Sequence, residues 1–184
     1  MATKTFHRGI RDMKIALWTS PNVYGTAYDV LGARNMSVEW VMETDELQGD
    51  DVVLDRYSKI LSVTVRMEQA SVDLEVVDML LGGTLISNEY YEDFMVGESD
   101  EVPYITAVGR VVGSGGQGDL HIHVPKMKIS GNLSFTAQLQ TYMLPTAEFQ
   151  GVHEGEINGM LRMRKFIAPT NLEIPLRTTT GGFS

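Results

Sequence analysis

Strict alternation of side chains between Lys59 and Gln69 constrains the fold more than any other feature of this sequence. Every second residue is apolar (Leu61, Val63, Val65, Met67), and the residues between them are polar (Ser62, Thr64, Arg66, Glu68). Because successive side chains of a strand point to opposite faces, this pattern predicts a strand with one buried face. The same alternation in Met36, Val38, Trp40 and Met42 predicts a second strand.

An acidic, turn-rich segment separates these two strands. It runs from Thr44 to Asp51 and contains Gly49, a residue that can adopt a positive φ. We expect a turn there, followed by a hairpin in which 52–54 and 59–69 pair around 55–58. The segment carries the acidic residues Asp45, Glu46, Asp50 and Asp51.

A short helix is predicted over residues 72–81, with Ser71 as the N-cap and Gly82-Gly83 as the stop. Apolar residues, including Val76, Val77, Leu80 and Leu81, cover much of its circumference. Such a helix needs cover on more than one side. Either it is a core helix of a monomer, or it lies between its own sheet and a neighbouring subunit.

Further strands are predicted at 84–96, 104–112, 120–129, 133–144 and 157–167, with Pro125 confining its strand to an edge or a bulge. One helix among about eight strands predicts a mainly β fold, a β-barrel or sandwich flanked by one short α-helix. We expect an extended N-terminal arm over 1–35, this domain over 36–167 and an extended C-terminal tail over 168–184.

Composition narrows the possible functions. The 184 residues contain no Cys, which excludes disulfides, thiolate catalysis and Cys-ligated zinc. No apolar run reaches the roughly 20 residues that span a bilayer, and no signal peptide is evident, so we expect synthesis in the cytoplasm. Residues 39–101 hold 17 Asp/Glu and three Lys/Arg within a chain of net charge −9. An acidic middle with basic flanks suits docking onto other copies in a fixed polarity, and disfavours nucleic-acid binding.

Three patterns resemble chemical sites without meeting their requirements. Gly113, Gly115 and Gly118 match a dinucleotide fingerprint, but a strand follows them in place of the required helix, which indicates a hairpin loop. Asp50-Asp51 and Glu92-Asp93 lack the ligand alternation of a calcium loop. We therefore predict no catalytic residues and no cofactor.

The third pattern is His121-x-His123, which resembles the first motif of cupin metal sites. Met127 and Lys128 stand where that motif requires a glutamate, so we predict no metal. Two histidines on one face of a strand need no metal to explain them.

The passage from Met36 to Gly83 resembles the conserved part of major tail proteins (tail tube proteins) of long-tailed bacteriophages. The resemblance rests on the alternating strand from Met36, the Glu-Leu-x-Gly-Asp-Asp stretch at 46–51 and the strand-helix-glycine passage from Ile60 to Gly83. It covers about a quarter of the chain.

The resemblance implies a structural virion protein, not an enzyme. Its copies would form hexameric rings that stack head-to-tail into the tail tube, through which DNA passes without specific binding. The partners implied are the chain itself, a tape-measure protein, a tail terminator and a distal tail protein. We expect Val76, Val77, Leu80 and Leu81 at a subunit interface, and Asp45, Glu46, Asp50 and Asp51 at the contact between rings or at the lumen. The alternatives are a β-barrel that binds a small ligand and a cupin-type metalloenzyme.

Overall fold

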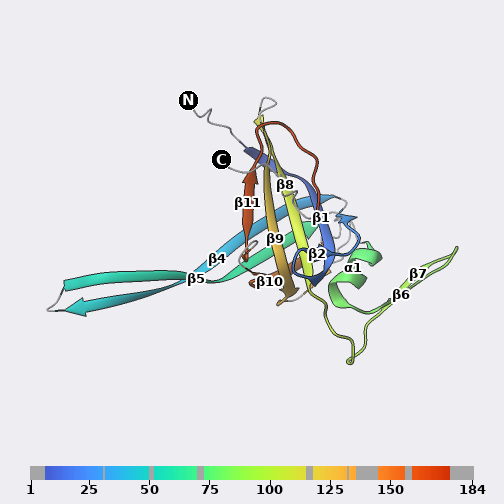
Figure 1. Ribbon diagram of the computed structural model, residues 1–184. Helices are drawn as coiled ribbons and strands as arrows, with labels where there is room; N and C mark the ends of the chain where they lie inside the picture. Colours follow the sequence, from blue (N-terminus) through green and yellow to red (C-terminus); the bar gives the residue numbers. More distant parts are fainter. Residues whose placement is uncertain are drawn as a thin grey trace.

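A curled antiparallel sheet, shaped like half a barrel, forms the body of the protein (Figure 1). The computed structural model describes residues 7–30, 32–49, 52–69, 73–114, 118–131, 133–135, 145–155 and 159–174. The strand order is β2-β1-β8-β9-β10-β5-β4, while β3 pairs with β1 and β11 pairs with β9. The strands of this sheet are β1 (His7–Ser20), β2 (Val23–Tyr24), β3 (Tyr28–Asp29), β4 (Ala33–Gly49), β5 (Val52–Gln69), β8 (Ile105–Gly113), β9 (Leu120–Ile129), β10 (Thr146–Gly151) and β11 (Arg162–Lys165).

Helix α1 (Leu74–Leu81) and a small second sheet, β6 (Thr84–Ser87) with β7 (Glu92–Met95), complete the described elements. The prediction of a mainly β fold with one short helix is confirmed for the described residues. That helix has 8 residues, so no described helix is long enough to cross a bilayer.

The hydrophobic core lies between one face of the sheet and α1. Its most deeply buried side chains come from strands far apart in sequence (Met13, Ile15, Val65, Ile105, Met127 and Phe149). Burying a side chain of this size contributes about 1.5–3 kcal/mol, so these contacts dominate the stability of the domain.

The prediction of an N-terminal arm over 1–35 is wrong for β1, which is a strand of the main sheet. Met13 pairs with Gly109 and Ile15 with Ala107, and both β1 side chains are buried. Register shifts at Arg8/Ile10 and Ile10/Asp12 interrupt the alternation, so the apolar residues of β1 show no regular period in the sequence. Residues 1–6 lie outside the described residues.

β4 and β5 form one long hairpin whose far half leaves the sheet (Figure 1). The predicted turn at 44–51 is wrong for residues 44–49, which belong to β4; β4 ends at Gly49 and pairs with β5 from Val52 onward, and residues 50 and 51 lie outside the described residues. The predicted hairpin around 55–58 is wrong, because these residues lie within β5. Asp45 pairs with Tyr57 and Glu46 with Arg56 as ordinary strand partners. The acidic residues look like turn residues in sequence, but Glu46 is compensated by Arg56 on the opposite strand. We call residues 42–49 and 52–60 the distal arm.

Asp73, not Ser71, caps α1, because its Oδ1 accepts a hydrogen bond from the Glu75 N–H at 3.0 Å. Ser71 and Val72 lie outside the described residues. The predicted stop is confirmed: Gly82 has φ 71° and its N–H donates to the Asp78 carbonyl. The single strand predicted over 84–96 is wrong, since Asn88 to Tyr91 form a turn that folds it into the β6–β7 hairpin.

The remaining predictions concern the β8–β9 pair and the last strands of the chain. Pro125 lies at a bulge between β8 and β9, as predicted. β8 and β9 pair antiparallel on either side of the glycine-rich segment, as a hairpin requires, and residues 115–117 of that segment lie outside the described residues. Of the strand predicted over 133–144, only 133–135 are described, and Ser134 bridges to Thr146. The predicted last strand is shorter, with β11 covering Arg162–Lys165.

Gly82→Ala should lower the free energy of unfolding by about 2 kcal/mol or more. A left-handed conformation costs a residue with a Cβ about 1–2 kcal/mol, and the added Cβ would lie 2.4 Å from the Glu101 carbonyl oxygen. Denaturant titration measures the change. Gly97→Ala is the matched control, because its Cβ would meet nothing closer than 3.7 Å. Equal losses in the two variants would contradict this explanation.

Candidate functional site

The distal arm exposes apolar side chains without a core to cover them. Met42, Leu47, Tyr57 and Ile60 are 57%, 63%, 64% and 54% exposed. Ion pairs between the strands join Lys59 to Glu43 at 2.8 Å and Arg56 to Glu46 at 2.5 Å. An isolated two-stranded hairpin is marginally stable in water at best, so an arm of this kind gains stability from a surface that covers it.

The structure describes two of the four acidic residues that were predicted to contact a neighbouring ring. Asp45 and Glu46 lie on β4 within the distal arm, and Glu46 is neutralised by Arg56. Asp50 and Asp51 lie outside the described residues. The distal arm therefore presents paired charges and exposed apolar groups together, and its role in stacking stays a prediction.

The helix residues predicted at a subunit interface are covered within the chain. Val76, Val77 and Leu80 are 3%, 3% and 5% exposed, while Leu81 is half-buried. The sheet contacts Val76 and Leu80, so these side chains belong to the core of the monomer. The chain itself thus covers the apolar surface of α1. A further contact of α1 with a neighbouring copy stays a prediction.

A polar surface covers the side of β10, β5 and β4 that faces away from the core. Direct cross-strand pairing puts Glu148, Arg66 and Ser37 in one row, and Gln150, Thr64 and Glu39 in the next. Thr146, Glu68 and Asn35 form a third row. We call these nine residues the polar face.

Arg66 is the one cation of the polar face, and carboxylates hold it on both sides. Its Nε donates to Glu148 Oε2 at 2.8 Å, and its Nη1 lies 3.7 Å from Glu39 Oε1. Including Glu68, the polar face carries three carboxylates and one base. It presents hydroxyls, amides and net negative charge, which makes it a poor ligand for phosphate.

A buried carboxylate joins the C-terminal segment to the sheet. Asp119 is fully buried; its Oδ2 accepts from Arg110 Nε at 2.8 Å and from the Thr170 N–H at 3.0 Å. Burial tends to raise the pKa of Asp119, but the hydrogen bonds from the Thr170 and Gly113 N–H groups and from Arg110 leave that pKa below its usual value. Leu172 packs nearby on Val108. Residues 170–174 of the predicted C-terminal tail thus pack against the sheet without forming a helix or strand, and 175–184 lie outside the described residues.

His121 and His123 lie in the interior on one face of β9, as the strand pattern predicts. Each is 1% exposed; His123 Nε2 lies 2.9 Å from Thr106 Oγ1, and the His121 ring packs 4.5 Å from that of Phe166. Burial lowers the pKa of His121 and lowers the pKa of His123 to about 4. Among the residues that the structure describes, no group of three or more His, Cys, Asp or Glu side chains is arranged to hold a metal ion.

Stability should therefore fall as the pH drops from about 6.5 to 4. The pKa of His123 is about 4 in the folded chain against 6.5 as its ordinary value, so the unfolded chain binds the proton first in this window. A shift of this size corresponds to about 3 kcal/mol once the titration is complete. Denaturant titration at pH 7 and pH 4.5 measures the loss.

The His123→Gln variant tests the cause of this pH dependence. Gln can still bond Thr106 but cannot gain a proton, so the variant should lose less stability across the window than the native chain. His153→Gln at an exposed position is the control and should retain the native slope. A native slope in His123→Gln would show that another group is responsible.

A second buried network, not anticipated from the sequence, surrounds Glu154. Its Oε1 accepts from Trp18 Nε1 at 2.8 Å and from the Tyr24 hydroxyl at 2.9 Å. Burial, with help from Glu154, raises the pKa of Tyr24 well above its usual value. Lys126 lies 3.8 Å above the Trp18 ring. These groups come from β1, β2, β9 and the chain after β10, and their separation in sequence hides the network.

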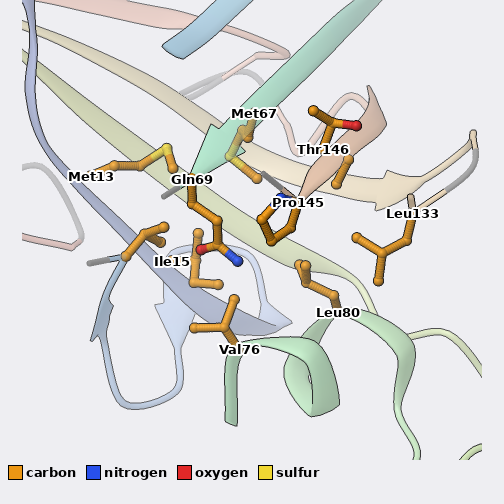
Figure 2. A pocket seen from close by; sticks show the side chains of 11 residues that line it. Met13, Ile15, Met67, Gln69, Val76, Leu80, Leu133, Pro145 and Thr146 are labelled. Atoms are coloured by element: carbon orange, nitrogen blue, oxygen red, sulfur yellow. The ribbon is translucent and has the colours of Figure 1, made fainter. Parts of the chain in front are cut away.

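An apolar cavity of about 20 Å³ lies between α1 and the sheet (Figure 2). Figure 2 shows Met13, Ile15 and Met67 on the sheet side, facing Val76 and Leu80 of the helix. The cavity has room for about one water molecule, so it is a gap in the packing. It is too small for the ligand of a small-molecule-binding β-barrel.

No protein-family model matches this chain, and no curated protein matches it either.

Proposed function

We propose that this chain is a structural protein that assembles with its own copies into hexameric rings, which stack into the tail tube of a long-tailed bacteriophage. The observation that carries the proposal is the distal arm, which extends apolar side chains beyond the core where another copy can cover them. The resemblance of residues 36–83 to tail tube proteins supplies the kind of assembly. Tape-measure, terminator and distal tail proteins are the further partners of such a tube.

The polar face is our candidate for the lining of the tube. DNA leaving a virion must slide along the lumen, and a lining of free Lys and Arg would retain it through its phosphates. Hydroxyls, amides and one arginine held by carboxylates bind phosphate weakly. Carboxylates also repel the duplex at short range, so DNA would pass over a layer of water and counterions.

Electron microscopy of the purified protein tests the proposal directly. We expect rings or stacked tubes, and a sedimentation profile that shifts to larger species as the concentration rises. Leu47→Asp with Tyr57→Asp, both on exposed positions of the distal arm, should reduce tube length strongly while leaving the fold intact. Tyr28→Phe, which keeps the ring outside the distal arm, is the control. A native chain that remains a monomer at every concentration would refute the proposal.

A further inference from the structure

The turn of the β6–β7 hairpin presents two tyrosines to solvent. Tyr90 is 86% exposed and Tyr91 60%. Their positions are fixed by Asn88, whose Oδ1 accepts from the N–H groups of Tyr90 at 2.8 Å and Tyr91 at 3.2 Å. We call residues 88–91 the tyrosine tip. These hydrogen bonds fix the backbone of the turn, and exposed tyrosines are typical anchors of protein interfaces.

The tyrosine tip lies in a strongly acidic stretch. Residues 82–101 contain six Asp/Glu and no Lys or Arg, with Glu89 and Glu92 next to the two tyrosines. A partner surface for the tip should therefore combine an apolar hollow with a positive charge at its rim.

A cleft with these properties opens where β1 and β4 approach each other. Its volume is about 260 Å³, and it is lined by Gly9, Ile10, Arg34, Asn35, Met36, Gly109, Val111 and Ile122. A cavity of ~150 Å³ already accepts benzene, so the cleft has room for a phenol ring. We call it the β1–β4 cleft.

Arg34 is the one charged side chain among these lining residues, and it is exposed. Among the described residues, no carboxylate lies within ion-pair distance of its guanidinium. Apolar walls with a single arginine at the rim complement an aromatic tip flanked by glutamates.

The tip and the cleft of one molecule cannot meet. In Figure 1 the β6–β7 hairpin extends away from the sheet beyond α1, whereas the cleft involves the start of β1 at the opposite end. A protrusion and a hollow at different places on one chain produce head-to-tail contacts, which close into a ring when the rotation between copies allows it.

We propose that the tyrosine tip of one copy inserts into the β1–β4 cleft of a second copy, with Glu89 and Glu92 facing its Arg34. The inference rests on the proposed self-assembly and names the contact that joins neighbouring copies. The tip and the cleft complement each other in charge and apolar character. We therefore expect a second copy of the chain to occupy the cleft.

Variants with reversed charges, and mixtures of variants, test this contact. Sedimentation velocity and electron microscopy measure their assembly. Tyr90→Ala with Tyr91→Ala removes the tip, and Arg34→Glu reverses the charge of the cleft. Each should raise the concentration needed for assembly by at least about tenfold, as for other interface anchors. Arg11→Glu, the same change at an exposed β1 position outside the cleft, should assemble normally. Circular dichroism and thermal unfolding verify that each variant is folded.

Two combinations give results that general destabilisation would not produce. Arg34→Glu combined with Glu89→Lys and Glu92→Lys should regain assembly, because the charges again match. A mixture of the tipless variant with the Arg34→Glu variant contains one native cleft and one native tip on different chains, so the two chains should form pairs but no rings.

The outcomes separate this inference from the proposed function. If the native chain forms rings and both single-surface variants do so equally well, the contact is wrong and the proposed function stands. If Arg34→Glu fails but the tipless variant assembles normally, another segment or partner fills the cleft, and the inference is overturned. If the native chain does not assemble, both are wrong.

Discussion

Replacing Asp119 by Ala is expected to lower the free energy of unfolding by about 3–5 kcal/mol, the usual cost of breaking a buried charged pair. The change removes the acceptor of Arg110 and of the backbone N–H groups of Gly113 and Thr170. It also releases residues 170–174 from the sheet, which should expose Leu172 to proteolysis. Chemical denaturation measures the first effect, and limited digestion followed by mass spectrometry the second.

Asp29→Ala is the matched control for this experiment. Asp29 also pairs with a base, Lys14 at 2.8 Å, but its side chain is 58% exposed. An exposed pair contributes about 0–1 kcal/mol, so this variant should remain close to the native chain. Similar losses in both variants would mean that burial does not determine the strength of the Asp119 contacts.

If the chain forms the tube that we propose, releasing Arg66 from its carboxylates should make that tube retain DNA. Glu39→Gln with Glu148→Gln keeps the shape of the polar face and removes both acceptors of the guanidinium. If the polar face lines the lumen, every ring gains a set of available arginines. Retention of short duplex DNA at ~50 mM salt should rise at least about tenfold and fall steeply as salt is added.

Two controls isolate the effect of Arg66. Adding Arg66→Gln to the double variant should return DNA retention to the native level. Glu75→Gln with Glu98→Gln changes the net charge equally at exposed positions outside the polar face, and should have little effect. Unchanged retention in the Glu39 and Glu148 variant would show that the polar face does not line the channel.

Regular alternation made β5 predictable, and irregular pairing concealed β1. In β5 the buried Val63, Val65 and Met67 occupy alternate positions, so the sequence alone identifies the core face. In β1, bulges on either side of Ile10 shift the phase of the apolar residues, and a window of fixed period misses the strand. The course of β1 depends on its pairing with β8. The local sequence around β1 does not reveal that pairing.

In the candidate site, too, some features could be predicted from local sequence and others could not. Residues 44–49 were predicted as part of a turn but belong to β4, because no local signal shows that Lys59 and Arg56 lie opposite Glu43 and Glu46. The helix stop at Gly82 was predictable, since a left-handed cap is a property of a single residue. The β1–β4 cleft was not, because its walls come from segments that are joined only by the closing of the sheet.

The pairing of β1 with β8 also has a consequence for how the chain is made. Met13 contacts Gly109, which leaves the ribosome 96 residues later (109 − 13). Until β8 emerges, β1 has no partner strand along most of its length, and this part of the sheet cannot form during early translation. Long-range β pairing of this kind folds in about milliseconds to seconds, far slower than local helices. A cell producing many copies at once would therefore hold a population of nascent chains whose first strand is exposed, and these chains would be prone to aggregate until β8 has been made.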